Sequence, residues 1–142
     1  MWKFEHTIET EASAKALWSL YSDVSTWTTW DKEIEDVKLN GPFTVGTTGT
    51  MKPIGQDPLF FKLVEVRENE GFVDETEIPG AGVLVIFTHT LKPLENGNTR
   101  ISHQVTIIGP TADVLGPQIG PAIILGIPKT MESLATVALA IR

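Results

Sequence analysis

Hydrophobic and polar residues alternate at the start of the chain. Trp2, Phe4, His6 and Ile8 alternate with charged or hydroxyl-bearing side chains. Alternation with a period of two is typical of a β-strand that buries one face. The sequence therefore predicts an opening strand with one face in the core.

The pattern becomes helical after this strand. Ser13 is a favourable N-cap because its hydroxyl can accept a hydrogen bond from a free amide of the first turn, so a helix is predicted over residues 14 to about 22. A second helical turn is expected with Ser25 as its cap and with Trp27 and Trp30 on one face. Two short helices should thus follow the first strand.

Six strand-like segments occupy the middle of the chain, with Gly, Pro and Asn residues marking the turns between them. These segments cover residues 37–39, 47–52, 59–67, 72–78, 82–93 and 99–108. Asn96-Gly97 is the clearest turn, since Asn-Gly is strongly favoured in tight β-hairpins. No helical segment interrupts the series, which favours antiparallel neighbours over a parallel α/β fold.

The last part of the chain has a helical pattern. Apolar residues at positions 119, 123, 127, 131, 134, 138 and 141 recur in steps of three and four. Pro117, Pro121 and Pro128 fall within this segment. An interior proline removes a backbone hydrogen bond and costs about 3 kcal/mol. We therefore expect an irregular or kinked first half and a regular helix from about Pro128, where proline suits the first turn.

These elements predict an α+β fold, in which a curved antiparallel sheet of seven strands surrounds a long C-terminal helix. The two short helices lie between the first and second strands. A chain of 142 residues has the usual length of one domain, so residues 1–142 are expected to form a single domain. Such a layout leaves space between sheet and helix, and we expect an apolar pocket on the order of a few hundred Å³ there.

Several segments resemble a known family. The stretch "HTIETEASAKALWSLYSDVSTWTTWDKEIEDVKLNGPFTVGTTGTMKP", the hairpin "FTHTLKPLENGNTRISHQVTIIGP" and the closing helix "GIPKTMESLATVA" carry the likeness. The first stretch contributes Ala14, Leu17, Trp18, Asp23, Val24, Trp27, Trp30, Asp31, Phe43, Gly46, Thr47 and Gly49. The chain resembles the polyketide cyclase/dehydrase-like branch of the START-like (SRPBCC, Bet v 1-like) superfamily over nearly its whole length.

This resemblance implies the helix-grip fold and a hydrophobic cavity for lipids, polyketides, aromatics or other small apolar molecules. Some members of the superfamily cyclise or dehydrate their substrates, and many only bind. None of the matching segments is a catalytic motif. The proline-rich final segment departs from the typical pattern of the family and affects the shape and entrance of the cavity.

The composition limits the kinds of partner that the protein is expected to bind. The net charge is -7, which disfavours binding to nucleic acids and to anionic lipid surfaces. Cysteine is absent, which excludes disulfides and thiolate sites and is compatible with a reducing compartment. The first six residues carry charges where a signal peptide needs an apolar segment, and residues 119–127 are too short to cross a bilayer. We expect a cytoplasmic protein without membrane insertion and without a cofactor.

The two histidines of the last hairpin are the best candidates for chemistry. His89 shares its strand face with Phe87, and His103 shares its face with Val105. If these apolar faces point inward, both imidazoles face the cavity and can act as acid or base on a bound carbonyl compound. Alternatively, they are hydrogen-bonded side chains that line the pocket passively. No metal site is expected, because a third ligand at suitable spacing is missing.

Carboxylates form a second candidate group. Glu75 and Glu77 share one strand face, and Asp74 and Thr76 share the other. A carboxylate pair can perform acid–base chemistry when one member is desolvated. We interpret the two glutamates as a solvated strand face, and Asp31 as a helix cap or surface carboxylate.

The residues expected to line the cavity come from the second helical turn, the strands and the closing helix. They are Trp27, Trp30, Met51, Phe87, His89, His103, Val105, Ile123, Ile127 and Met131. Aromatic and Met side chains suit this role because they offer large apolar surfaces that adapt to varied ligands. Ordinary core packing is the alternative interpretation of these tryptophans and methionines, and Trp18 is expected in the core.

Three functions fit these observations. The first is binding of a small hydrophobic molecule such as a lipid, polyketide or aromatic compound. The second is a cyclase, dehydratase or hydrolase acting on a polyketide-like substrate, with His89 or His103 as the acid/base. The third is a protein-interaction or quinone-binding module, which would have a filled core and an exposed apolar patch. The sequence leaves the ligand and the oligomeric state open.

Overall fold

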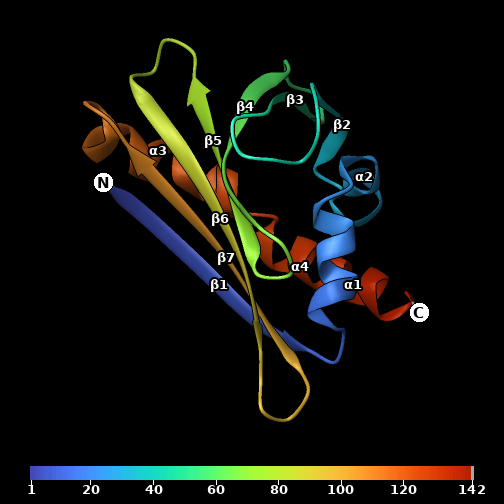
Figure 1. The fold of residues 1–142 in the computed structure, drawn as a ribbon. Coiled ribbons are helices and arrows are strands. Elements are labelled where there is room, and N and C mark those ends of the chain that lie inside the picture. The colour runs from blue at the N-terminus through green and yellow to red at the C-terminus, as the bar shows by residue number, and fades with distance from the viewer. Residues whose placement is uncertain (142) are drawn as a thin grey trace.

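A curved antiparallel sheet of seven strands forms the centre of the computed structural model, which describes residues 1–141 (Figure 1). The strand order is β1-β7-β6-β5-β4-β3-β2. The strands are β1 (Trp2–Thr10), β2 (Ile34–Leu39), β3 (Thr48–Pro53), β4 (Leu59–Arg67), β5 (Gly71–Ile78), β6 (Val83–Pro93) and β7 (Thr99–Ile108). The predicted α+β architecture is therefore confirmed.

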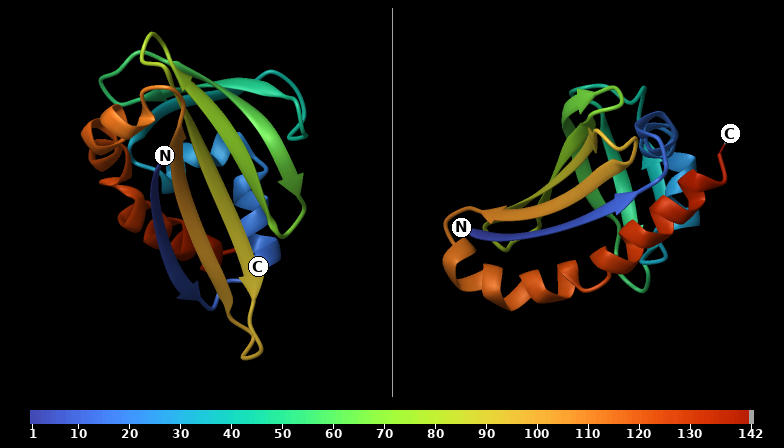
Figure 2. Two further views of the ribbon diagram at one scale, coloured as in Figure 1. Left: turned by 90° about the vertical axis from the view of Figure 1, so that its left-hand side faces the viewer. Right: turned by 90° about the horizontal axis from the view of Figure 1, so that it is seen from below.

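Helices cover the concave side of this sheet. Between β1 and β2 lie α1 (Ala14–Tyr21), the 3-10 turn η1 (Val24–Thr26) and α2 (Trp27–Trp30). After β7 the chain forms α3 (Ala112–Ile124) and α4 (Ile127–Leu139). In Figure 2 the last two helices run end to end along one face of the strands, with a bend between them. This is the helix-grip arrangement.

The register of the central strands places the three histidines of the chain side by side. β1 pairs with β7 so that His6 lies opposite His103, and β6 pairs with β7 so that His89 lies opposite His103. The hairpin that sets the second register closes with a bond from the Leu94 amide to the Asn98 carbonyl (2.8 Å), and Gly97 takes a positive φ there. Directly opposed residues of antiparallel strands project to the same face. All three imidazoles thus share the concave face.

The caps of the first two helical turns differ in how well the sequence predicted them. The Ser13 hydroxyl accepts a hydrogen bond from the Ala16 amide (3.0 Å), so Ser13 caps α1 as expected. The expected Ser25 cap is wrong, because Asp23 caps η1 by accepting from the Ser25 amide (3.1 Å) and hydroxyl (2.6 Å). A carboxylate two residues earlier outcompetes the hydroxyl, since it can accept both bonds at once.

The C-terminal helices bend later than expected. The chain is already helical through Pro117 and Pro121, and the break falls at Leu125 and Gly126. Both prolines lie on the exposed side of α3, where water can satisfy the carbonyls they leave free. Pro128 occupies the first turn of α4, in agreement with its preference for that position.

Two glycines allow α3 to pack closely on β1. A Cβ atom on Gly116 would lie 2.6 Å from the Cβ atom of Trp2, and one on Gly120 would lie 2.5 Å from its indole ring. Ala112, Gly116 and Gly120 are the buried residues of α3, and they are four apart on one helix face. The small face of α3 therefore accommodates the large side chain of Trp2.

The segment Ala112–Leu139, which comprises α3 and α4, is apolar although much of it is exposed: its mean hydropathy is 1.4 over its most apolar window, of which 22% is buried. With 28 residues, it is long and apolar enough to cross a membrane by length and composition alone. The apolar segment is thus longer than residues 119–127. Core helices of globular domains pass the same test, so the absence of membrane insertion stays a prediction.

Two packed clusters make up the core. The larger cluster joins α1, α2 and α4 to the sheet and contains Tyr21, Leu63, Phe72, Met131 and Leu134, all of them fully buried. The smaller cluster lies under α3 and contains Val83, Val85, Val105, Ile107 and Ala112. Trp18 belongs to the larger cluster, as expected.

Candidate functional site

A pocket of about 590 Å³ lies between the concave face of the sheet and the C-terminal helices. Its wall draws residues from both core clusters, from α2 and from the junction of α3 and α4. Nine of the ten residues expected at the cavity line it: Trp27, Trp30, Met51, Phe87, His89, His103, Val105, Ile123 and Ile127. The pocket is thus mainly apolar, with a few polar side chains.

The expectation that Met131 lines the cavity is wrong. Its side chain is fully buried in the larger core cluster, and the pocket wall does not include it. After the bend at Gly126, α4 packs against α1 and α2, so its apolar stripe meets those helices. The pocket is therefore bordered by α3 and the first turn of α4, and the rest of α4 fills the core.

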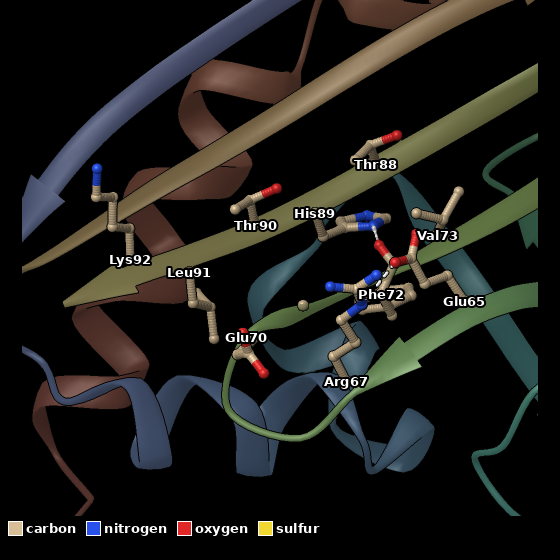
Figure 3. Close-up of a pocket in the computed structure, with 11 residues that line it drawn as sticks. Glu65, Arg67, Glu70, Phe72, Val73, Thr88, His89, Thr90, Leu91 and Lys92 are labelled. Atoms are coloured by element: carbon tan, nitrogen blue, oxygen red, sulfur yellow. Dashed lines mark hydrogen bonds and ion pairs between the residues drawn. The ribbon is translucent and has the colours of Figure 1, made fainter.

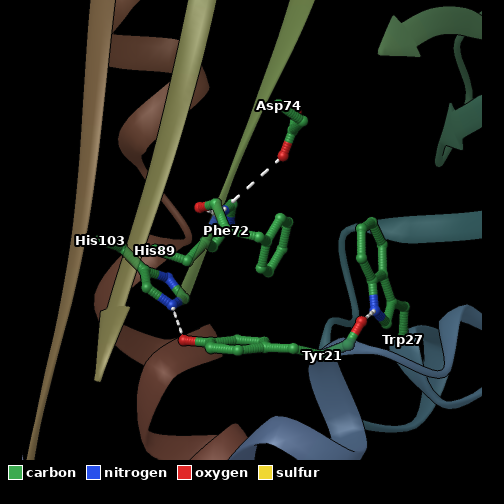
Figure 4. Close-up of polar contacts among 6 residues, drawn as sticks. All are labelled: Tyr21, Trp27, Phe72, Asp74, His89 and His103. Atoms are coloured by element: carbon green, nitrogen blue, oxygen red, sulfur yellow. Dashed lines mark hydrogen bonds and ion pairs between the residues drawn. The ribbon is translucent and has the colours of Figure 1, made fainter. Parts of the chain in front are cut away.

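A buried polar cluster lies at the inner wall of the pocket (Figure 4). The hydroxyl group of Tyr21 and Nε2 of His103 are 2.6 Å apart, and Nδ1 of His89 lies 3.3 Å from the backbone carbonyl oxygen of Phe72. The two imidazole rings are in edge-to-face contact, with centroids 4.7 Å apart. The strand register therefore brings His89 and His103 together, and α1 adds a tyrosine that the sequence analysis did not single out.

Asp74 is the fourth member of this cluster. One of its carboxyl oxygens lies 4.0 Å from Nδ1 of His89, and only 8% of the residue is exposed. Its directly opposed neighbours are Leu63 on β4 and Phe87 on β6, both apolar. Among the described residues, no hydrogen bond to the Asp74 carboxyl group is found within 3.5 Å. The carboxyl group borders the pocket instead.

Burial shifts the pKa values of the side chains in this cluster. Desolvation, reinforced by the nearby charge of Glu75, raises the pKa of Asp74 to about 8. Desolvation lowers the pKa of His89 to about 4, although its bond to the Phe72 carbonyl opposes the shift. Desolvation and the two neighbouring imidazoles also lower the pKa of His103, and burial raises that of the Tyr21 hydroxyl. At neutral pH the cluster is therefore uncharged, with Asp74 as an acid and His89 as a neutral imidazole.

Aromatic rings continue the wall from this cluster toward α2. The His89 ring stacks on Phe72 with a centroid distance of 3.9 Å, and Phe72 in turn stacks on Trp27 at 5.8 Å. Trp27 also stacks on Phe61 at 6.0 Å and donates its indole N–H to the Tyr21 carbonyl (3.0 Å). The wall thus offers ring faces beside a small set of polar atoms.

The mouth of the pocket lies between the turn after β3 and the bend after α3. Ile54 and Leu125 line it, although they are 59% and 83% exposed. Asp31 lies at the same rim and accepts a hydrogen bond from the Glu33 amide (3.0 Å). Burial raises the pKa of Asp31. This hydrogen bond agrees with the interpretation of Asp31 as a cap, and the side chain is in addition partly buried and borders the pocket.

Glu75 and Glu77 lie away from the pocket. Glu75 is half-buried, Glu77 is exposed, and neither lines the pocket. Asp74 lies on the opposite strand face with Phe72, and this apolar companion is the sequence signal that could have identified it. Among residues 1–141, no group of three or more His, Cys, Asp or Glu side chains is arranged to hold a metal ion.

A smaller pocket of about 280 Å³ lies beside the turn between β4 and β5 (Figure 3). Charged side chains line it, including Glu65 and Arg67, whose carboxylate oxygen and guanidinium nitrogen are 2.6 Å apart. Both partners of this ion pair are largely in contact with water. This smaller pocket lacks the apolar wall of the larger one, so the larger pocket is the candidate functional site.

Comparison with known proteins matches residues 1–138 to a family described as "Polyketide cyclase / dehydrase and lipid transport". The chain belongs to this family. It is accordingly a member of the SRPBCC superfamily, as its sequence segments indicated. A search of curated protein sequences finds no match.

Solved structures share the fold of this polyketide cyclase/dehydrase family member at low sequence identity. Ara h 8.0201 is 13% identical with a TM-score of 0.78, and 98% of each chain is covered. Norcoclaurine synthase from Thalictrum flavum, in complex with dopamine and hydroxybenzaldehyde, is 17% identical with a TM-score of 0.70, covering 99% of this chain and 87% of that one. A hypothetical protein from Helicobacter pylori is 16% identical with a TM-score of 0.74, covering 96% and 86%. These likenesses establish the fold.

Proposed function

We propose that this protein binds a small, largely apolar molecule in the pocket between the sheet and the C-terminal helices. The observation that carries this proposal is the size and lining of the pocket. A volume of about 590 Å³ lies within the range of small-molecule sites, and its wall combines many apolar and aromatic residues with a few polar groups. Side chains that orient a ligand are typically few and placed in this way.

The family and one structural relative support the same function. The family's description includes lipid transport, and norcoclaurine synthase holds two small aromatic molecules, dopamine and hydroxybenzaldehyde, on a similar fold. The aromatic wall formed by Trp27, Phe61 and Phe72 suits a ligand with a flat apolar body. We place this binding in the cytoplasm, as the sequence composition suggested.

Two measurements test the binding function. Native mass spectrometry of the protein purified from its source cells should detect a copurifying small molecule. Titration with the neutral fluorescent probe N-phenyl-1-naphthylamine should change the Trp emission, because Trp27 and Trp30 line the pocket. A folded sample that carries no small molecule and leaves both the probe and the Trp emission unchanged would contradict the proposal.

Acid–base catalysis on a carbonyl compound is the second candidate function, favoured by the polar cluster. Tyr21 and His103 are in direct contact, and Asp74 and His89 lie 4.0 Å apart with their pKa values displaced toward neutral forms. A protonated carboxyl group can donate a proton while a neutral imidazole accepts one, which is the division of labour that cyclisation or dehydration requires.

The catalytic proposal is tested with a substrate that the protein turns over. Replacing His89 and His103 together by Ala should lower the rate about 10²–10⁴-fold, the usual contribution of a general acid or base. Binding of an apolar probe should change much less, because the apolar wall supplies most of the contact. Turnover by the double variant within a factor of a few of the wild type would eliminate imidazole catalysis.

A further inference from the structure

The larger pocket is lined by carboxyl groups and by no Lys or Arg side chain of the described residues. Three carboxyl groups line it, those of Asp31 and Glu33 at the rim and that of Asp74 at the inner wall. A ligand with a carboxylate or phosphate group would therefore meet only acidic or neutral side chains, and its charge would be desolvated without a counter-ion.

The inner carboxyl group is arranged to receive a partner. The Asp74 side chain is 11% exposed, it borders the pocket, and the described residues give its carboxyl group no hydrogen bond within 3.5 Å. His89, at 4.0 Å, is neutral at neutral pH and supplies no opposing charge. No side-chain polar atom of the described residues is both fully buried and without a hydrogen bond, so the carboxyl oxygens of Asp74 stay accessible and can accept hydrogen bonds from a ligand.

Aromatic rings lie near the same point. Phe87 lies directly opposite Asp74 on β6, and Phe72 lies two residues away on the same face of β5. Both rings line the pocket, and Phe72 is stacked on His89 and on Trp27, through which it continues into the aromatic wall. The rings therefore offer apolar contact to the body of a ligand, and Asp74 is the group beside them that can hold an ammonium group.

We propose that the pocket takes an amphipathic amine, with its ammonium group held by Asp74 and its apolar body along the aromatic wall. This inference rests on the proposed binding function and names the chemical class of the ligand. On binding, the positive charge of the amine stabilises the carboxylate form of Asp74, so the two groups enter the complex as an ion pair. The acidic rim of Asp31 and Glu33, together with the net charge of -7, attracts such cations toward the mouth.

Three probes of nearly identical shape test the preference for an amine. They are 2-(1-naphthyl)ethylamine, 2-(1-naphthyl)ethanol and 1-naphthaleneacetic acid, which differ in the charge of the terminal group. Isothermal titration calorimetry at pH 7 should find the amine bound at least about tenfold more tightly than the alcohol, since the ion pair adds to the shared apolar contact. The acid should bind most weakly.

Two substitutions on the same strand identify the residue responsible. Asp74→Asn should reduce the ratio of amine to alcohol affinity by about tenfold, and should leave the affinity for the alcohol within a few-fold of wild type. Glu77→Gln is the matched control, because it makes the same carboxyl-to-amide change at an exposed position of the same strand outside the pocket. This control should leave the ratio unchanged.

A measurement on the wild-type protein makes the test independent of variant folding. The ¹³C chemical shift of the Asp74 carboxyl carbon should move from the value of an acid to that of a carboxylate when the amine binds. An unchanged shift in the amine complex, an unchanged affinity ratio in folded Asp74→Asn, or binding of the acid as tight as that of the amine would each overturn the inference. Those results would not contradict the proposed binding function. A folded protein that binds none of the three probes would contradict the binding function itself.

Discussion

Asp74 determines how the inner wall of the pocket responds to pH. Its neighbours Leu63 and Phe87 are apolar and its carboxyl group faces the cavity, so folding removes it from bulk water without supplying an opposing charge. The protonated form is therefore favoured in the folded protein, and the pKa rises to about 8 from about 4 in an unfolded chain. The native state thus holds a proton on this group at neutral pH.

This bound proton predicts a stability difference between the wild type and Asp74→Asn. Between about pH 4 and pH 8 the native state binds one more proton at Asp74 than the unfolded state does, so raising the pH destabilises the wild type. Relative to Asp74→Asn, the free energy of unfolding of the wild type should fall as the pH rises through this range, with a slope of up to about 1.4 kcal/mol per pH unit. Urea unfolding of both proteins across the range measures the slope.

His89 and His103 titrate in the opposite sense but are present in both proteins. Their pKa values are lowered by burial, so their contribution to stability is lost as the pH falls below about 6.5, and it largely cancels in the comparison. Glu77→Gln, the same carboxyl-to-amide change at an exposed position of the strand, is unfolded in parallel as the control. A constant difference between the wild type and Asp74→Asn from pH 4 to pH 8 would show that Asp74 is ionised in the folded protein.

Tyr21 provides a second prediction about a single side chain. Its hydroxyl group is buried against Nε2 of His103 at 2.6 Å, so Tyr21→Phe leaves one imidazole nitrogen without its partner. The substitution should lower the free energy of unfolding by about 1–3 kcal/mol. Thr7→Val is the comparison: it removes a hydroxyl contact to Ser102 at the exposed face of the sheet and should stay within about 0.5 kcal/mol of wild type. Equal effects of the two substitutions in chemical denaturation would contradict the prediction.

The sequence predicted the histidine pair but not its partners. His89 and His103 could be placed on one face because alternation fixes the direction of strand side chains, and the Asn96-Gly97 turn indicated that the two strands pair. Asp74 has the same parity as Phe72, yet a charged residue followed by Glu75 and Glu77 resembles part of a solvated segment. Tyr21 comes from a helix whose position over the sheet depends on tertiary packing, which one sequence does not reveal.

Helix α3 depends on close packing against the first strand. Replacing Gly by Ala in a helix normally stabilises it by up to about 1 kcal/mol. For Gly120→Ala we expect the opposite, a loss of about 1–3 kcal/mol, because the new methyl group would lie 2.5 Å from the Trp2 indole ring. Thermal or urea unfolding of this variant measures the sign of the change in the free energy of unfolding.

Removing the ring gives the control for this contact. In a Trp2→Val background, Gly120→Ala should cost little or should stabilise the protein, since the methyl group then has space. Destabilisation by Gly120→Ala that is equally large with and without the Trp2 ring would show that the close approach of α3 to β1 is not its cause.

Helix α4 offers a matched pair of leucines. Leu134 is fully buried in the larger core cluster, whereas Leu139, at the end of the same helix, is 53% exposed. Leu134→Ala should lower the free energy of unfolding by about 2–5 kcal/mol, and Leu139→Ala should change it by about 0.5 kcal/mol or less. Chemical denaturation of both variants tests the assignment of the buried stripe, and similar midpoints for the two would contradict it.

Strands and helices differed in how far their limits could be predicted. The expected strands over residues 59–67 and 99–108 agree with β4 and β7, because turn residues bound them on both sides. The closing helix was expected to be irregular around Pro117 and Pro121, but both rings point to solvent and α3 continues through them. The bend comes at Leu125 and Gly126, where the chain passes the mouth of the pocket, and proline positions alone did not reveal it.

The arrangement of sheet and helices explains why the pocket opens where it does. The sheet and α1, α2 and α4 close one end with the larger core cluster, and α3 closes the other by packing on β1. Between these two packed regions the helical layer bends at Gly126, whose position a Cβ atom could not occupy without meeting Glu33 at 2.9 Å. The mouth therefore lies at the bend, bordered by exposed Leu125 and Ile54.

Access through this mouth can be tested by narrowing it. Ala122 lies on the exposed side of α3 and lines the pocket, so Ala122→Trp should fill part of the entrance and lower the affinity for 2-(1-naphthyl)ethanol by about tenfold or more. Val114→Trp adds a ring to an exposed position of the same helix outside the pocket and should leave the affinity unchanged. Both substitutions are at exposed positions, so the free energy of unfolding should stay within about 0.5 kcal/mol of wild type. Calorimetric titration measures the probe affinity of both variants. Equal affinity for folded Ala122→Trp and Val114→Trp would mean that the ligand does not enter between α3 and the turn after β3.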